Sequence, residues 1–431
     1  MKIVVFGLSV TSSWGNGHAT TFRALLAALH RRKHRIVFFE KDEEWYASNR
    51  DLPSPGFCDV RLFTDWRTIL PFVRQELADC DVVILGSFFP EGIRAAHEII
   101  NAKKPVKVFY DIDTPITLNN LRAGGADYLK PQQVRAFDLY LSFTAGPILE
   151  QLQREFGARR ALPLYCSFEP EKYHPRGLFR RYQCDLSYMG TYAADRQEKL
   201  DELFTRPAQE LAHRRFILAG PQYPSKLRWP KNVRRIRHLS PRWHPHFYSS
   251  SRLTLNLTRK GMVEWGYSPS VRLFEAAGCG CPIISDAWPG LDTVFNIGEE
   301  VLLAERAQDV MHVLENCDDA QLTRMGMRAR ERVLDEHSSA RRAEQFEDYV
   351  SSVASTRCLW LRRFWRQPAY TQGRWNQREC NPETKEASPV IRTKLANRNA
   401  EGMASNHAIA NGFMKGHGFS RAARNLKKAR L

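Results

Sequence analysis

The stretch SPSVRLFEAAGCGCPIISD at residues 268–286 runs from a loop into a helix, a glycine-rich turn and an apolar strand. Gly278 and Gly280 can end the helix, and Pro282 can begin the strand that follows. A helix that leads directly into a buried strand is typical of a βαβ unit and a parallel sheet. We therefore expect an α/β fold, whose ligands bind beyond the carboxyl ends of the strands.

The same stretch carries side chains suited to a nucleotide. Ser270, Val271 and Arg272 are expected in the first helical turn, where free N–H groups and a guanidinium suit a diphosphate. Glu275 lies one turn further on, where a carboxylate can accept both hydroxyls of a ribose. The alternative is a plain helix–turn–strand connection with an incidental ion pair.

Apolar runs alternate with helical patterns on both sides of this stretch. The patterns predict strands at 2–7, 35–40, 81–86, 106–111 and 138–144, and again at 184–190, 215–220, 233–238, 252–258 and 282–286. Helices are expected after residue 17 and near 195–204, 270–278, 305–316 and 320–355. The fold class is therefore α/β, with two Rossmann-like domains in tandem and parallel sheets in both.

A proline-containing segment, SFEPEKYHPRG at 167–177, separates the two alternating regions and is expected to be a linker. We place an N-terminal domain at 1–168 and a C-terminal domain at 169–337. A helix at 338–355 is expected to pack back toward the first domain. Residues 356–431 are expected to form a disordered basic tail.

Charge is concentrated in that tail, where 16 Lys and Arg stand against 4 Asp and Glu, a net +12 of the chain's +17. The basic balance is therefore no evidence that the folded part binds nucleic acid. CLWLRRFWRQ at 358–367 suits an anionic membrane surface, and a solvated tail is the alternative.

No stretch approaches the roughly 20 apolar residues of a membrane span. Nine cysteines lack a CxxC pair or metal-like spacing, which indicates reduced thiols in a cytoplasmic protein. If the tail contacts the inner membrane, the protein would be peripherally associated with that membrane.

The first predicted strand is followed by Gly15, Gly17 and His18 at the start of a helix. The glycines allow close approach of a ligand, and an imidazole there can take a proton from an attacking hydroxyl. His18 can equally cap the helix or bind the loop. The spacing G-x-G-x-x-T, with Glu40 ending the second strand, keeps an NAD-dependent oxidoreductase as an alternative.

Asp111 and Asp113 follow the strand at 106–111 and could ligate Mn²⁺ or Mg²⁺ as a D-x-D pair. Only two ligands are present, so we prefer an acceptor-side or structural role. Asp113-Thr114-Pro115 is expected to form a turn in which the Asp side chain bonds the backbone.

The 268–286 stretch resembles the nucleotide-sugar motif of GT-B glycosyltransferases of the "group 1" type. That family has two glutamates with seven residues between them; Glu275 matches the second, and Tyr267 stands in place of the first, which approaches the sugar. NGHATTFRALLAALHRRKHRIVFFEKD (16–42), VFYDIDTPITL (108–118) and DLSYMGTYAADRQ (185–197) resemble the CgeB-type spore-maturation glycosyltransferases. This likeness covers most of residues 1–350.

The resemblance implies a glycosyltransferase that moves a sugar from a nucleoside-diphosphate sugar to an acceptor hydroxyl, with no metal and no separate cofactor. The donor would bind the second domain, and the acceptor (a glycan, lipid, protein or small molecule) would bind the first. Arg272 would stabilise the leaving group, and His18 matches the catalytic base of inverting GT-B enzymes, although the C-terminal motif is that of the retaining group. The implied donor-binding positions are Gly190, Thr191 and Arg196 for the phosphates, and His238 and Leu239 for the base.

Two alternatives accompany that reading. Arg196 could be an ordinary helix-surface arginine. A non-catalytic sugar- or lipid-binding protein on a GT-B scaffold also fits, because fold does not establish function.

Overall fold

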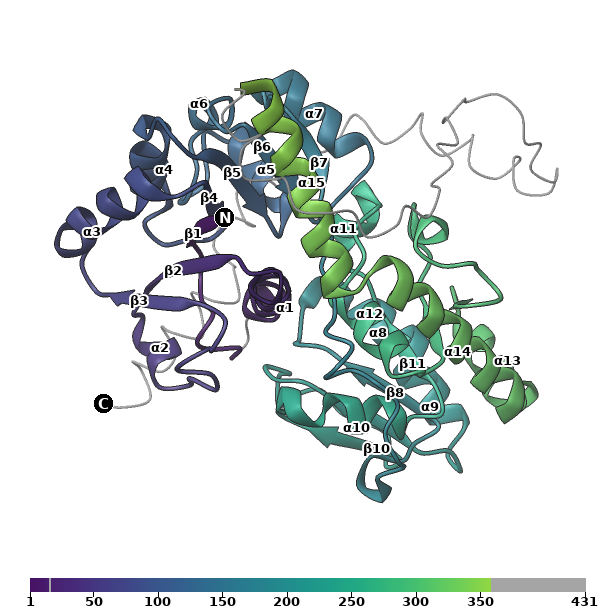
Figure 1. Ribbon diagram of the computed structural model, residues 1–431. Coiled ribbons are helices and arrows are strands. Elements are labelled where there is room, and N and C mark those ends of the chain that lie inside the picture. The colour runs from purple at the N-terminus through teal and green to yellow at the C-terminus, as the bar shows by residue number, and fades with distance from the viewer. Residues whose placement is uncertain (15–16, 358–431) are drawn as a thin grey trace, which may run out of the picture. The chain divides into compact units, whose positions relative to one another are not determined.

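The computed structural model describes residues 1–14 and 17–357, with side chains described as far as residue 353, and these residues contain two parallel sheets (Figure 1). The first sheet has seven strands in the order β3-β2-β1-β4-β5-β6-β7, and the second has six in the order β10-β9-β8-β11-β12-β13. The expected α/β fold with two parallel-sheet regions is confirmed.

The first sheet is buried on both faces except at its edge strand β3. Its strands are β1 (Lys2–Phe6), β2 (Arg35–Lys41), β3 (Asp59–Phe63), β4 (Val82–Gly86), β5 (Val106–Asp111), β6 (Leu139–Ser142) and β7 (Ala161–Pro163). Successive side chains of a strand point to opposite faces, so Val4 and Phe6 enter one apolar cluster while Ile3 and Val5 enter another. This two-sided burial explains why the strands are continuous apolar runs.

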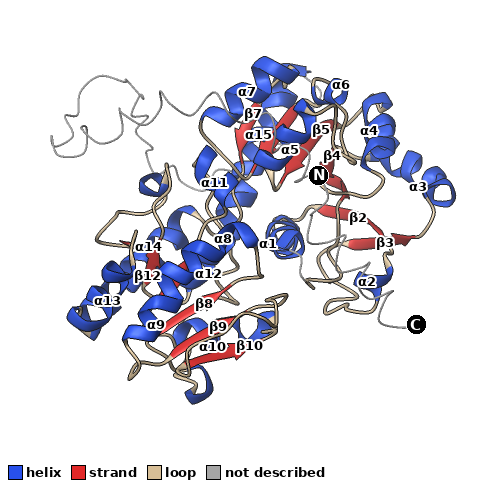
Figure 2. Ribbon diagram, turned by 180° about the vertical axis from the view of Figure 1, so that it is seen from behind, coloured by secondary structure: helices blue, strands red, loops and turns tan. Residues whose placement is uncertain are grey.

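The second sheet follows the same rule. Its strands are β8 (Leu186–Met189), β9 (Phe216–Ala219), β10 (Val233–Ile236), β11 (Thr254–Asn256), β12 (Ile283–Ser285) and β13 (Leu302–Leu303). Phe216 and Leu218 pack on one face, and Ile217 and Ala219 pack on the other. Figure 2 shows β8, β9 and β10 side by side.

Helices connect the strands and cover the sheets. In the first half they are α1 (Gly17–Arg31), α2 (Glu44–Ala47), α3 (Trp66–Asp79), α4 (Gly92–Asn101), α5 (Thr114–Arg122), α6 (Pro131–Val134) and α7 (Pro147–Phe156). In the second half they are α8 (Ala194–Leu200), a π-helical turn (Asp201–Thr205), α9 (Arg206–Glu210), α10 (His244–Ser249), α11 (Lys260–Trp265), α12 (Val271–Gly278), α13 (Ala307–Asn316), α14 (Asp319–Glu336) and α15 (Ser339–Arg357).

The helical pattern at 320–355 forms two helices, because α14 ends at Glu336 and α15 begins at Ser339, close to the start of the helix expected at 338–355. Between them the chain meets the predicted linker, where the Phe168 carbonyl accepts a hydrogen bond from the Ser339 N–H at 2.9 Å. Helix α15 then packs on α1, β5 and β6 of the first sheet. It places Phe346 and other apolar side chains in the same cluster as β1.

The segment at 167–177 is more than a linker, since Phe168 and Tyr173 are both buried in the core of the second half. The sequence patterns also missed β3, β7 and β13. The described cysteines are free thiols. None of the helices in the described ranges has both the length and the apolar character needed to cross a membrane. Gly15 and the predicted tail from residue 358 lie outside the described residues.

Candidate functional site

The loop before α12 and the end of β11 together hold Arg272 in place. The Oδ1 of Asn256, the last residue of β11, accepts hydrogen bonds from the Ser270 hydroxyl at 2.9 Å and from Arg272 Nη1 at 3.3 Å. The Asn256 amide in turn donates to the Ser285 hydroxyl at 3.0 Å, which fixes its orientation. Arg272 also lies over the Tyr188 ring, 5.6 Å from its centroid.

Ser270 immediately precedes α12, and Val271 and Arg272 are its first two residues, as the sequence predicted. The first N–H groups of a helix have no partner within it and carry the positive end of its dipole. A half-buried guanidinium beside these groups makes an anion-binding arrangement at the carboxyl edge of the second sheet.

Glu275 lies one turn into α12 and is buried, with 4% of its surface exposed. Burial raises the pKa of its carboxyl to about 7, and a hydrogen bond with Tyr173 opposes that rise. His244 Nδ1 lies 3.8 Å from the Glu275 carboxylate and 3.4 Å from the Tyr173 hydroxyl. Burial lowers the pKa of His244 to about 4, so this imidazole is neutral near pH 7.

Leu239 belongs to the same group of contacts, because its carbonyl lies 3.2 Å from His244 Nε2. The neighbouring His238 is exposed. The structure thus links the predicted Leu239 and Glu275 through His244. The sequence analysis missed His244, Tyr173 and Asn256, because they come from separate segments and only the fold brings them to α12.

The predicted phosphate loop after β8 lies against Arg272. A Cβ atom added to Gly190 would lie 3.2 Å from Arg272 Nη2, so glycine allows the backbone to come close. The Arg196 guanidinium donates to the Thr191 carbonyl at 2.6 Å. The Nε of Arg196 is buried and has no hydrogen-bond partner among the described residues. Gly190, Thr191, Arg196 and Arg272 therefore lie at one edge of the sheet.

In the first half of the chain, His18 and Asp113 meet. His18 is the second residue of α1 and is buried, and its Nε2 lies 3.3 Å from Asp113 Oδ2. The His18 ring also packs edge-on against Phe88, with centroids 5.5 Å apart. A carboxylate beside an imidazole can orient the ring and stabilise its protonated form, as a general base requires.

The turn predicted at Asp113-Thr114-Pro115 is wrong, because Thr114 begins α5, and the Asp113 side chain faces His18 without capping the helix. Asp111 is fully buried and accepts hydrogen bonds from Thr117 at 2.8 Å and from Tyr140. Burial raises the pKa of Asp111 to about 6. Among the described residues, no group of three or more His, Cys, Asp and Glu forms a metal-binding cluster.

Glu40 is not available to a dinucleotide. Its buried carboxylate accepts hydrogen bonds from the Ser9 and Thr11 hydroxyls and from the N–H groups of Val10 and Thr11, at 2.6–3.0 Å. This carboxylate fixes the loop after β1. The acid on which the NAD alternative depended therefore has a structural role.

Tyr267 has a left-handed backbone, with φ of 47°, which is uncommon for a bulky residue. Its N–H donates to the Pro289 carbonyl at 2.6 Å, and its own carbonyl accepts from the Ala145 N–H at 2.9 Å. A Cβ on either Gly146 or Gly290 would lie 2.4 Å from the Tyr267 ring. The residue is thus fixed between two loops, three positions before Ser270.

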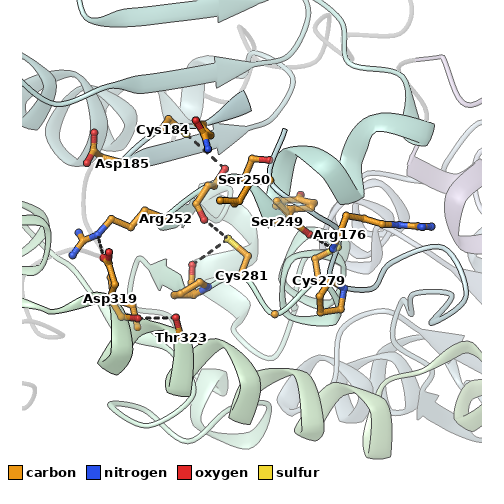
Figure 3. A pocket seen from close by; sticks show the side chains of 18 of the residues that line it. Arg176, Cys184, Asp185, Ser249, Ser250, Arg252, Cys279, Cys281, Asp319 and Thr323 are labelled. Carbon is orange, nitrogen blue, oxygen red and sulfur yellow. Dashed lines mark hydrogen bonds and ion pairs between the residues drawn. The ribbon is translucent and has the colours of Figure 1, made fainter. Parts of the chain in front are cut away.

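A cavity of about 560 Å³ lies at the opposite edge, against the amino ends of β8, β11 and β12. Figure 3 shows that its Arg252 is paired with Asp319. The Cys184 thiol donates to the Ser251 hydroxyl, and the Cys281 thiol donates to the Ser251 carbonyl. Burial raises the pKa of Cys184 to about 12, so this thiol is unreactive near neutral pH. Asp185, which also lines the cavity, is paired with Arg214. We place the functional site at the carboxyl edge, where ligands of parallel α/β sheets bind.

Comparison with known proteins identifies a matching family model and solved structures of similar fold. Residues 196–348 match a family described as glycosyl transferase-like, and a search of curated proteins finds no match. Sucrose-phosphate synthase from Thermosynechococcus elongatus is 13% identical, with a TM-score of 0.60, over 82% of this chain and 99% of its own.

Anabaena HepE, solved with UDP and glucose, is also 13% identical, with a TM-score of 0.58 over 82% of this chain and 100% of its own. An alpha-glucosyltransferase solved with UDP is 12% identical, with a TM-score of 0.60 over 81% of this chain and 100% of its own. The chain has the GT-B fold of these structures, and together with the family match this supports the glycosyltransferase superfamily.

Proposed function

We propose that the chain transfers a glycosyl group from a nucleoside-diphosphate sugar to an acceptor hydroxyl, without a metal ion. The main support is the arrangement of Arg272 and Arg196 at the carboxyl edge of the second sheet. Neither guanidinium forms an ion pair with a carboxylate of the described residues, and one of them lies at the N-terminus of α12. Cations left without protein carboxylates at such an edge suit the phosphates of a ligand.

The chemistry requires stabilisation of a leaving group. The bond between the anomeric carbon and the phosphate oxygen breaks, and its electron pair stays on the nucleoside diphosphate. A bond from the acceptor oxygen to that carbon forms, and the acceptor proton leaves. Arg272, helped by Arg196 and the first N–H groups of α12, is proposed to stabilise the growing charge on the diphosphate.

His18 is the proposed base for the acceptor proton, with Asp113 holding its ring. The 3.3 Å approach of Asp113 to His18 Nε2 supports this pairing. Glu275 is proposed to accept the ribose hydroxyls, and Leu239 and His238 to lie near the base. The N-terminal sequence segments support a finer assignment to the CgeB type within the superfamily.

A binding assay tests the donor site. The full chain is mixed with UDP-, GDP-, ADP- and dTDP-sugars and with NADH, all with EDTA, and the melting temperature is measured. We expect one or more nucleotide sugars to raise it, and Arg272→Gln to reduce that shift. The control is Arg324→Gln on the exposed side of α14.

The result separates the alternatives. Stabilisation by NADH but by no nucleotide sugar would favour an oxidoreductase. Binding of nucleotide sugars without release of nucleoside diphosphate, in the presence of a wide panel of hydroxyl acceptors and water, would favour a non-catalytic binding protein.

A further inference from the structure

One arginine at the same sheet edge has no role in the proposed transfer. Arg235 lies on β10, and its guanidinium lies over two rings, 4.3 Å from the centroid of Tyr223 and 4.9 Å from that of Trp229. Both rings come from the loop after β9. Tyr223 also packs edge-on against Tyr192 of the loop after β8, with centroids 5.5 Å apart. The two rings hold the guanidinium in place between them through cation–π contacts.

The hydrogen-bonding capacity of this guanidinium is largely unused. Its one contact with a protein acceptor is a long one, 3.5 Å from Nη2 to the Gly220 carbonyl, and its Nε is buried without a partner among the described residues. No described carboxylate pairs with Arg235, and burial lowers its pKa. A partly desolvated arginine with spare N–H groups is expected to meet acceptors on a ligand.

Four residues form a continuous row, with Arg235 and Arg272 at its two ends and Gly220 and Gly190 between them. Gly220, which Arg235 contacts, lies so close to Gly190 that an added Cβ would be 1.9 Å from the Gly190 carbonyl oxygen. Gly190 in turn lies against the Arg272 guanidinium. The row crosses the ends of β10, β9 and β8 to the start of α12, and its two central residues have no side chain. Ligands of parallel α/β sheets bind along this carboxyl edge, so one elongated ligand can reach both arginines.

We propose that Arg235 recognises the base of the nucleoside diphosphate and selects bases that present a carbonyl oxygen over bases that present an amino group there. The inference rests on the proposed function, which puts the diphosphate at the Arg272 end of the row. A guanidinium has donors only, so it pairs with the carbonyl of uracil or guanine. The amino group of cytosine or adenine would face those N–H groups with another donor.

UDP and CDP provide the sharpest test, because their bases differ only at C4, a carbonyl oxygen against an amino group, and at the adjacent N3, which carries a hydrogen in uracil alone. Dissociation constants are measured by calorimetry for the full chain with UDP, CDP, GDP and ADP. We expect UDP to bind about tenfold more tightly than CDP, and GDP more tightly than ADP. In Arg235→Met the ratio should fall to near one, mainly through weaker binding of UDP.

Arg234→Met is the matched control, since Arg234 is the preceding residue of the same strand, is exposed and donates to the Arg181 carbonyl. It should keep the UDP-to-CDP ratio of the wild type. Arg235→Lys, which keeps the charge but loses the planar fork, should give an intermediate ratio, and it serves as the test if Arg235→Met does not fold.

Three results would overturn the inference. A wild-type chain with no preference for UDP over CDP, or an Arg235 variant that keeps the full preference, removes the role of Arg235 while leaving the donor site intact. Failure of the folded wild type to bind any of the four diphosphates removes the proposed function as well.

Discussion

Replacement of Glu275 by glutamine should stabilise the ligand-free protein above pH 7 while weakening donor binding. Burial raises the pKa of this carboxyl from an ordinary 4.5 to about 7. The folded chain therefore holds a proton that the unfolded chain has released between these values, and the free energy of unfolding falls as pH rises through this window. The difference of about 2.5 pKa units corresponds to about 3 kcal/mol.

The assay is urea denaturation of wild type and Glu275→Gln at pH 4.5 and pH 8. At pH 4.5 the two free energies of unfolding should differ by only about 0.5 kcal/mol, because the folded wild-type carboxyl is then neutral and the unfolded one is half ionised. At pH 8 the variant should be more stable by up to about 3 kcal/mol. Comparison of the two chains cancels the contribution of a buried group that does not contact Glu275, such as Asp111.

The same variant should lose donor affinity, because a carboxylate that accepts two ribose hydroxyls is replaced by an amide with one acceptor oxygen. Melting-temperature shifts must be taken against each chain's own ligand-free value. A constant stability difference from pH 4.5 to 8 would refute the account of Glu275 as a carboxyl whose ionisation opposes folding. Unchanged donor affinity would refute its binding role.

Three further predictions follow from individual contacts. Arg272→Gln should lower kcat for donor turnover about 100-fold, since loss of one such hydrogen-bond donor raises the barrier by about 3 kcal/mol. If the fold-change in kcat is smaller than the fold-change in donor affinity, Arg272 does not act in leaving-group departure. His18→Ala should slow transfer to the acceptor at least about 100-fold at an unchanged donor dissociation constant. Transfer by the variant at the wild-type rate would exclude His18 as the base. Gly220→Ala should lower the free energy of unfolding by about 3 kcal/mol in urea denaturation, because Gly220 has a φ of 148° and an added Cβ would lie 1.9 Å from the Gly190 carbonyl oxygen. Gly261→Ala is the control and should be nearly neutral, because a Cβ there meets nothing within 4 Å.

The sequence was most informative where one local segment determines the structure. Helix α12 begins and ends where Ser270 and Gly278 indicated, because the loop, the apolar periodicity and the glycines all act within a few residues. Edge strand β3 was missed because four of its five residues are not fully buried, so it lacks the continuous apolar run of a central strand. A helix beginning near residue 338 was expected, but the contact of Ser339 with Phe168 was missed, because it joins segments far apart in the sequence.

For the candidate site too, the sequence was informative only where the residues lie in one local segment. Arg272 and Glu275 could be proposed from their spacing on one helix. Asn256, which orients Arg272, and Tyr173, which lies beside Glu275, come from a strand end and a supposed linker. Pairwise proximity across separate segments has no signal in a single sequence, which is also why Arg235 was not singled out.

The central claim is that this chain breaks the bond between sugar and diphosphate without a metal ion. The most direct measurement is phosphorus NMR of the full chain with each nucleotide sugar that it binds, in EDTA, with and without a panel of hydroxyl acceptors. The account predicts that nucleoside diphosphate signals appear with wild type and are about 100-fold slower with Arg272→Gln. Binding without any such signal, or signals that vanish in EDTA and return with Mg²⁺ or Mn²⁺, would contradict it.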